Sequence, residues 1–236
     1  MSASGSITIR GSATLSATYA PTGRFITADA DYALVRSWAE LADCDLQRGH
    51  EAQVRFVTGL TQVPTLKGVS LPCFRGRRFP SAHRPASDEM GPPPAEVASE
   101  GRYNTSGESV LYLCESEVGI AREPIAGDGP LWIQWFVLPT EKLAIADFSS
   151  LRADDFASKV FWFAELAGNE GVAHRLHFSQ LVASLVGKRF DGMRIPGVRG
   201  NHDVRYSNIV VFRAAERCWR NWLSAQPTQA APDGFV

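Results

Sequence analysis

The sequence predicts an α+β fold that carries a helical element near its N-terminal end. Two apolar runs of strand length, Val110–Cys114 and Leu131–Leu138, are rich in aromatic and β-branched residues. Other segments repeat apolar residues at the three- and four-residue spacing of a helix. Because the two kinds of segment do not alternate regularly along the chain, the pattern favours α+β over a doubly wound sheet.

Composition places the protein among ordinary globular proteins. Its 236 residues are enough for one domain with appendages, and 24 basic against 25 acidic residues give a net charge of −1, which argues against a direct nucleic-acid partner. No stretch approaches the roughly 18 apolar residues of a membrane span, and the first residues lack the apolar core of a secretory signal. The four cysteines lie far apart without a CxxC pair. We therefore expect reduced thiols, a cytoplasmic location and no membrane partner.

The N-terminal part of the chain changes character twice. Residues 1–22 are rich in Ser, Thr, Ala and Gly, which predicts a flexible tail with one short strand at Ile7–Ile9. Residues 23–70 are predicted to form a helical element that is too small to bury a large core alone. Its first helix has an apolar face of Leu34, Trp38 and Leu41, and its second spans Gln47–Leu60 with Val54 and Val57 as its apolar side.

The rest of the chain is predicted to hold a long loop, strands and helices. Ser87–Gly107 contains three consecutive prolines and no apolar periodicity, and such loops are often functional. Further strands are expected at Lys142–Asp147 and Asn208–Phe212, and helices at Phe156–Leu166 and Phe178–Val186. Residues 214–236 are predicted to form a C-terminal helix and a polar tail, the helix with an apolar stripe of Ala215, Cys218, Trp219, Trp222 and Leu223.

The most informative segment runs from Gly101 to Glu123. It reads as a glycine-punctuated loop that leads into a buried strand and a short helix beginning near Ser116, a good N-cap. Arg102 lies where the loop enters the strand, Tyr112 lies inside the apolar run, and Glu123 ends the helix, where an acid opposes the helix dipole. An acidic residue at this unfavourable position is more typical of a functional site than of a surface without a function. A solvated helix end and a core tyrosine with an occupied hydroxyl are the alternatives.

This segment resembles the central signature of the RES domain, a family named for its Arg, Glu and Ser. The match is carried by the Gly-Arg-Tyr-Asn sequence at residues 101–104, the Leu-Tyr-Leu strand, the Glu-Ser pair and Glu123. The resemblance extends in order from Leu71 to Arg213, so residues 71–213 are the expected RES-like catalytic domain. The other agreeing segments are Phe74–Arg77, Met90–Pro94, Phe190–Pro196 and Asn208–Phe212.

The resemblance implies a mixed, mostly antiparallel core similar to that of ADP-ribosyltransferases. It also implies an enzyme that cleaves the nicotinamide–ribose bond of NAD+, with water or phosphate as the acceptor. RES proteins are toxins of bacterial toxin–antitoxin pairs, so a growth-inhibiting role and an antitoxin over the active site are implied as well. NAD+ would be the substrate, and no cofactor or metal is expected. Transfer of ADP-ribose to a macromolecule and a catalytically silent binding module stay open as alternatives.

The resemblance assigns roles to particular residues. The expected catalytic residues are Glu123, Arg102 and Tyr112. A fixed carboxylate suits the positive charge that develops on the sugar, guanidinium groups suit a pyrophosphate, and a tyrosine ring can pack on nicotinamide or ribose. The expected substrate-binding residues are Arg75 with Arg77 as its competitor, Tyr103, Asn104 and Ser207.

One position departs from the family pattern. Gly197 stands where a serine is expected, and Ser207 is the candidate to supply the missing hydroxyl. Three consequences of this glycine stay open: altered use of the acceptor, weaker catalysis, or loss of activity. The segment Phe190–Pro196 around it can alternatively be read as a solvated turn.

The histidines and the C-terminal tryptophans are given simpler interpretations. His174 and His177 have helical spacing and are expected to be a surface pair, while His202 is a candidate general base. Trp219 and Trp222 are expected to pack either within the chain or at a subunit interface. A homodimer is therefore left open.

Overall fold

The computed structural model describes residues 30–42, 47–68, 70–123, 125–152, 154–169, 173–197 and 206–230, with four two-residue strands nearer the N-terminus. Those strands form two antiparallel pairs, β1 (Ser6–Ile7) with β2 (Leu15–Ser16) and β3 (Thr18–Tyr19) with β4 (Phe25–Ile26). The remainder of the predicted tail, and residues 198–205 with His202, lie outside the described residues.

The centre of the fold is an eight-stranded sheet with the order β12-β8-β6-β7-β11-β10-β9-β5. The pair β9–β10 is parallel and the other neighbouring pairs are antiparallel. This confirms the predicted α+β class with a mixed, mostly antiparallel sheet. The strands are β5 (Thr65–Leu66), β6 (Ser70–Arg78), β7 (Val110–Cys114), β8 (Leu131–Pro139), β9 (Ile145–Asp147), β10 (Gly192–Pro196), β11 (Ser207–Phe212) and β12 (Thr228–Gln229).

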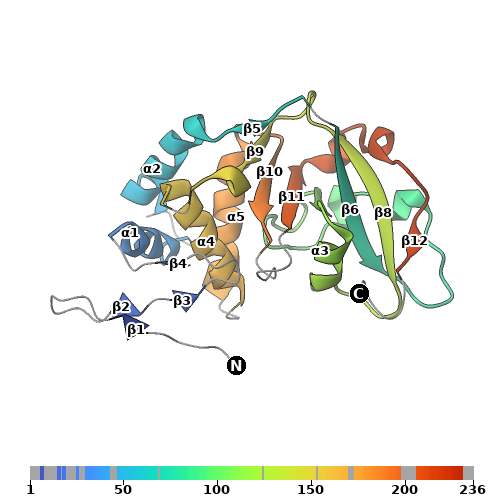
Figure 1. Ribbon diagram of the computed structural model, residues 1–236, viewed down its shortest axis with the longest axis horizontal. Helices are drawn as coiled ribbons and strands as arrows, with labels where there is room; N and C mark the ends of the chain where they lie inside the picture. The colour runs from blue at the N-terminus through green and yellow to red at the C-terminus, as the bar shows by residue number, and fades with distance from the viewer. Residues whose placement is uncertain are drawn as a thin grey trace.

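Four helices cover one end of this sheet (Figure 1). They are α1 (Ala30–Ala39), α2 (Glu51–Gly59), α4 (Phe156–Asn169) and α5 (Ala173–Gly187). Trp38 of α1 packs edge-on against Phe178 of α5 with ring centroids 4.9 Å apart, so the N-terminal helices share a core with the later ones. A fifth helix, α3 (Glu117–Arg122), lies apart from them, between β11 and β6 in Figure 1.

Alternation along β7 and β11 divides the core into two sides. Val110 and Val210 pack into the core that the four helices cover, whereas Leu111 and Ile209 pack against β8 and the C-terminal turns. Tyr112 and Asn208 therefore share the first side. This register places both residues on the face where α3 lies.

The predicted second helix is present, but the prediction of its buried face is wrong. Helix α2 begins at Glu51, and Val54 and Val57 are 54% and 44% exposed. The buried side chains are those of Ala52, Phe56 and Leu60, at four-residue spacing, because the helix turns its aromatic residue toward the core.

The predicted C-terminal helix is wrong. Residues after β11 form two 3₁₀ turns, η6 (Ala214–Glu216) and η7 (Trp219–Trp222), before β12. Trp219 and Trp222 are nevertheless buried, three residues apart in a single turn, which explains why the apolar spacing resembled a helix. Both pack within this chain, against the core of β7, β8 and β11.

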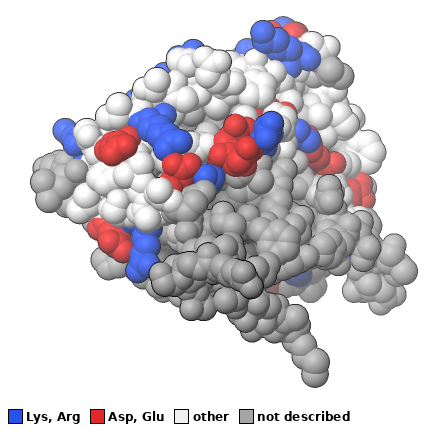
Figure 2. All heavy atoms as spheres, turned by 60° about the vertical axis from the view of Figure 1, so that its left-hand side comes forward, with Lys and Arg blue, Asp and Glu red and all other residues white. Residues whose placement is uncertain are grey.

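The long predicted loop is present and contains η3 (Ser87–Met90) and η4 (Ala95–Val97). Two other 3₁₀ turns are η2 (Leu60–Gln62) and η5 (Phe148–Ser150). In the described part of the chain, no helix combines the length and hydrophobicity needed to cross a bilayer. On the face that Figure 2 shows, basic and acidic side chains are interspersed and do not gather into a patch of one sign.

Candidate functional site

A cavity of about 360 Å³ lies between β6, β7, β11 and α3. Its volume is within the range of small-molecule sites. It brings together five of the side chains selected from the sequence, which come from a strand, a loop, a second strand and the end of a helix. The lining residues are Arg75, Gly76, Arg102, Tyr103, Tyr112, Leu113, Cys114, Ile120, Glu123, Ile125, Asn208 and Val210.

Arg75 is the most buried charge in this cavity wall. The residue is 8% exposed, and its Nη1 has no hydrogen-bond partner among the described residues. Burial lowers the pKa of its guanidinium well below the ordinary value; the charge of Arg77 acts in the same direction and Tyr112 opposes it. A buried donor without an acceptor is costly, and a bound anion would relieve that cost.

The loop Gly101–Asn104 is built around the hydroxyl of Tyr112. That hydroxyl donates to Asn104 Oδ1 at 2.8 Å and accepts from the Tyr103 amide at 2.9 Å. Burial raises the pKa of Tyr112 above its ordinary value, although the charge of Arg102 opposes the shift. The hydroxyl of Tyr112 is therefore occupied inside the loop, and the residue also lines the cavity.

Asn104 organises the same loop and does not line the cavity. Its side-chain amide donates to the carbonyls of Ser99 at 2.9 Å and Thr105 at 3.0 Å, with a longer bond to Glu108 at 3.3 Å. Asn104, which was predicted to bind substrate, therefore uses its side-chain nitrogen on backbone carbonyls and its side-chain oxygen on the Tyr112 hydroxyl. These hydrogen bonds hold the loop that carries Arg102 and Tyr103.

Glu123 reaches the cavity from the end of α3. The helix begins at its N-cap Ser116, whose hydroxyl accepts from the Gly119 amide, and Glu123 is its C-cap residue, as the sequence predicts. Glu123 Oε1 accepts two hydrogen bonds, from the Tyr206 hydroxyl at 2.9 Å and from Asn208 Nδ2 at 2.8 Å. Oε2 has no hydrogen-bond partner within the described residues, so one oxygen is anchored and the other is available.

Close packing of α3 on β6 depends on Gly76. A Cβ at this position would lie 2.6 Å from Ile120 and 2.5 Å from Ile125. The missing side chain lets these two isoleucines close the apolar wall of the cavity. No sequence signal singled out Gly76, although it stands between the two candidate arginines.

Two further predicted binding residues, besides Asn104, lie outside the cavity. Arg77 donates from Nη1 to the carbonyl of Glu89 at 2.7 Å and does not line the cavity, so Arg75 is the arginine that the structure places there. Ser207 also does not line the cavity. Because side chains alternate along β11, Ser207 and its neighbour Asn208 point to opposite faces, and Asn208 is the one beside Glu123.

The structure explains the glycine at position 197. The Gly197 amide donates to the Tyr206 carbonyl at 2.9 Å, and a Cβ there would overlap the edge of the Tyr206 ring at Cε2. The Tyr206 ring therefore fills the volume that a side chain at 197 would need. Gly197 lacks a hydroxyl, but Tyr206 brings one to Glu123. The surrounding segment is the strand β10 with buried Met193 and Ile195, not a solvated turn.

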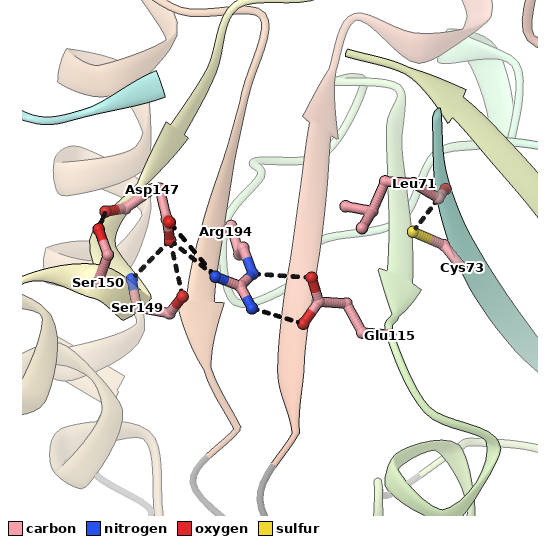
Figure 3. Close-up of polar contacts among 7 residues, drawn as sticks. All are labelled: Leu71, Cys73, Glu115, Asp147, Ser149, Ser150 and Arg194. Atoms are coloured by element: carbon pink, nitrogen blue, oxygen red, sulfur yellow. Dashed lines mark hydrogen bonds and ion pairs between the residues drawn. The ribbon is translucent and has the colours of Figure 1, made fainter. Parts of the chain in front are cut away.

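An ion-pair network crosses the opposite face of the sheet (Figure 3). Arg194 of β10 forms a bidentate pair with Glu115 at 2.7 and 2.8 Å and contacts Asp147 of β9 at 3.2 Å. Asp147 also accepts from the Ser149 amide and hydroxyl. Because every nitrogen of the guanidinium has a carboxylate partner, this arginine is used within the fold. No motif in the sequence predicted this network, because its three charged residues lie far apart along the chain.

Among the described residues, no histidine lines this cavity. No group of three or more His, Cys, Asp or Glu side chains suited to a metal ion occurs in the part of the chain that the structure describes. His177 is exposed on α5, and His202 lies outside the described residues.

A scan against protein-family models finds no match for this chain, and searches of the curated proteins and of the solved structures find none. The residues of the cavity are therefore the structural basis for any proposed function.

Proposed function

We propose that this protein is an enzyme that cleaves the nicotinamide–ribose bond of NAD+, with water or phosphate as the acceptor of the ribosyl carbon. One observation carries the proposal: a single cavity joins a buried arginine with an unsatisfied donor, a second arginine, a tyrosine ring and a carboxylate anchored on one oxygen. These are the residue types that the RES resemblance assigns to NAD+ cleavage.

The arginines suit the pyrophosphate of NAD+. Arg75 and Arg102 both line the cavity, and a planar guanidinium can bind two phosphate oxygens at once. The unpartnered Nη1 of Arg75 supports an anionic ligand in particular, because a phosphate oxygen supplies the acceptor that the described part of the chain lacks.

The carboxylate suits the reacting sugar. When the C1′–N bond breaks, neutral nicotinamide leaves with the bonding electron pair and positive charge remains on the ribose. Glu123 Oε2 can stabilise this oxocarbenium-like state or accept from a ribose hydroxyl, while Oε1 stays bound to the protein. A water or phosphate oxygen then forms the new bond to C1′, and an attacking water loses a proton to solvent. The Tyr112 ring supplies a flat wall for nicotinamide or ribose.

The proposed biological role follows from the same resemblance. Loss of NAD+ would inhibit growth, so the protein would act as a toxin in the cytoplasm, held inactive by a protein antitoxin that covers the cavity. The packing of Tyr206 against Gly197 weighs against a catalytically silent module. The Tyr206 ring occupies the space of the side chain that Gly197 lacks, and its hydroxyl bonds to Glu123.

The direct test is product analysis. Purified protein, shown by mass spectrometry to carry no second chain, is incubated with NAD+ with and without phosphate. Nicotinamide with ADP-ribose indicates hydrolysis, and nicotinamide with phosphorylated ADP-ribose indicates phosphorolysis. An unchanged NAD+ peak at high enzyme concentration contradicts the proposal. Protein labelling from NAD+ with a reporter on its adenine would instead indicate a transferase.

A further inference from the structure

Tyr206 occupies a slot between two glycines. Its ring lies against Gly197, after β10, and against Gly119, within α3; a Cβ on either residue would come closer than 3.0 Å to ring atoms. Real side chains do not approach so closely, so neither position accepts even a methyl group while the ring is in place. Tyr206 is buried, and its hydroxyl is the atom that reaches Glu123.

The same slot sets the position of α3. Gly119 also faces Cys114, whose Sγ would collide with a Cβ on this glycine, so the helix rests directly on the strand and on the tyrosine ring. Ile120 and Glu123 follow Gly119 along this helix and both line the cavity. A change in the Tyr206 ring would therefore move the helix that carries the carboxylate.

We propose that Tyr206, seated between Gly119 and Gly197, is a positioning residue that holds Glu123 Oε1 and leaves Oε2 to the substrate. This inference rests on the proposed function for its kinetic consequence. Tyr206 does not line the cavity, so it acts through Glu123 and not on substrate. Asn208 donates to the same oxygen from the cavity wall, and the two donors together define one carboxylate orientation.

The kinetic test separates positioning from substrate binding. Tyr206→Phe keeps the ring and removes the hydroxyl, so kcat for nicotinamide release should fall about 10- to 100-fold while KM for NAD+ changes less than about threefold. Tyr32→Phe, on the partly buried α1 tyrosine beside Phe163, is the matched control and should keep wild-type kcat. An unchanged kcat in Tyr206→Phe, or a change confined to KM, overturns the inference.

Gly197→Ala tests the slot from its other wall. The added methyl group would displace the ring, so its kcat should fall as in Tyr206→Phe. The control is Gly59→Ala, because a Cβ on Gly59 meets no atom within 4 Å. Wild-type kcat in Gly197→Ala would show that the position of the ring does not matter.

A stability cycle tests the contact without using NAD+. Tyr206→Phe should lower Tm in the wild-type background and lower it less in the Glu123→Ala background, because the hydrogen bond is then already lost. Gly197→Ala should likewise lower Tm strongly in wild type and weakly beside Tyr206→Ala. Additive shifts in both cycles overturn the inference. If wild type releases no nicotinamide but both cycles are coupled, the proposed reaction fails while the positioning of Glu123 stands.

Discussion

Gln180 Nε2, on α5, donates a hydrogen bond to the main-chain carbonyl of Asn104 at 3.1 Å. The same buried amide reaches the carbonyl of Gly101 at 3.0 Å, so one helix side chain holds both ends of the loop that carries Arg102 and Tyr103. The helical core and the cavity are thereby linked by a polar contact that no apolar periodicity reveals.

Removing that contact should weaken substrate binding. In Gln180→Ala the loop loses one or two hydrogen bonds worth roughly 1 kcal/mol each, so KM for NAD+ should rise about 5- to 30-fold. Ser184→Ala, on the same helix, is the control, because its hydroxyl bonds to the carbonyl of Leu181 within that helix and not to the loop. Steady-state kinetics at a temperature where circular dichroism shows both variants folded make the comparison. A wild-type KM in Gln180→Ala would refute the anchoring role.

Arg75→Met should separate stability from function. Replacing a buried, incompletely paired charge by an apolar side chain of similar length should leave Tm unchanged or raise it. The same change removes the proposed phosphate ligand, and KM for NAD+ should rise at least about tenfold, since hydrogen bonds to charged groups contribute about 1.5–3 kcal/mol. Thermal unfolding and nicotinamide release are measured on the same preparation. A large fall in Tm with unchanged KM would make Arg75 a structural residue.

Arg194→Met, in contrast to Arg75→Met, should lower Tm. It leaves Glu115 and Asp147 without their shared cation, and both carboxylates are largely buried. We expect the free energy of unfolding to fall by about 1–3 kcal/mol, the cost of leaving buried acceptors unpaired, or Tm to fall by roughly 3–10 °C. Arg152→Met is the control, because its pair with Asp154 is exposed and surface pairs contribute little. Equal Tm values for the two variants would contradict the structural role of the network.

Asp31 should give the N-terminal helices a pH-dependent contribution to stability. A hydrogen bond from Lys159 of α4 lowers the pKa of Asp31 below 3.8; burial opposes the shift and Arg55 of α2 adds to it. The stabilisation is therefore present above the ordinary pKa and is lost as the pH falls through the lowered one. Asp31→Asn should lower Tm at pH 7, and the difference from wild type should shrink below about pH 4. A constant difference down to pH 3 would contradict this assignment.

Much of the fold follows from local patterns. Val110–Cys114 matches β7 residue for residue, and Ser116 and Glu123 bound the short helix, because strand-length apolar runs and N-caps are local signals. The nine-residue strand β6 was not predicted, because Pro72, Gly76 and the arginines interrupt the alternation of apolar and polar residues that is typical of a strand. The C-terminal tryptophans show the opposite case, in which a spacing typical of an α-helix was predicted to be one but belongs to a short 3₁₀ turn.

The candidate site was predictable only in part. The Gly101–Glu123 motif located Arg102, Tyr112 and Glu123, which the structure brings to one cavity. Ser207 was predicted to bind substrate and Asn208 was not, but Asn208 is the one that lines the cavity, because one residue along a strand reverses the face. Tyr206 could not be found from sequence, because it lies 83 residues from the carboxylate it contacts. Only the register of β10 against β11 brings Gly197 beside its ring.

We propose that Glu123 is the residue that makes this cavity an NAD+-cleaving site, and one pair of variants tests that claim. Glu123→Gln keeps an oxygen that can accept from Tyr206 and Asn208 but removes the negative charge, whereas Glu117→Gln changes an acid on the same helix that contacts Trp135 outside the cavity. Nicotinamide release at saturating NAD+ is measured for both variants and wild type. We predict a loss of at least about 100-fold in Glu123→Gln and wild-type turnover in Glu117→Gln. Wild-type turnover in a folded Glu123→Gln protein would contradict the claim.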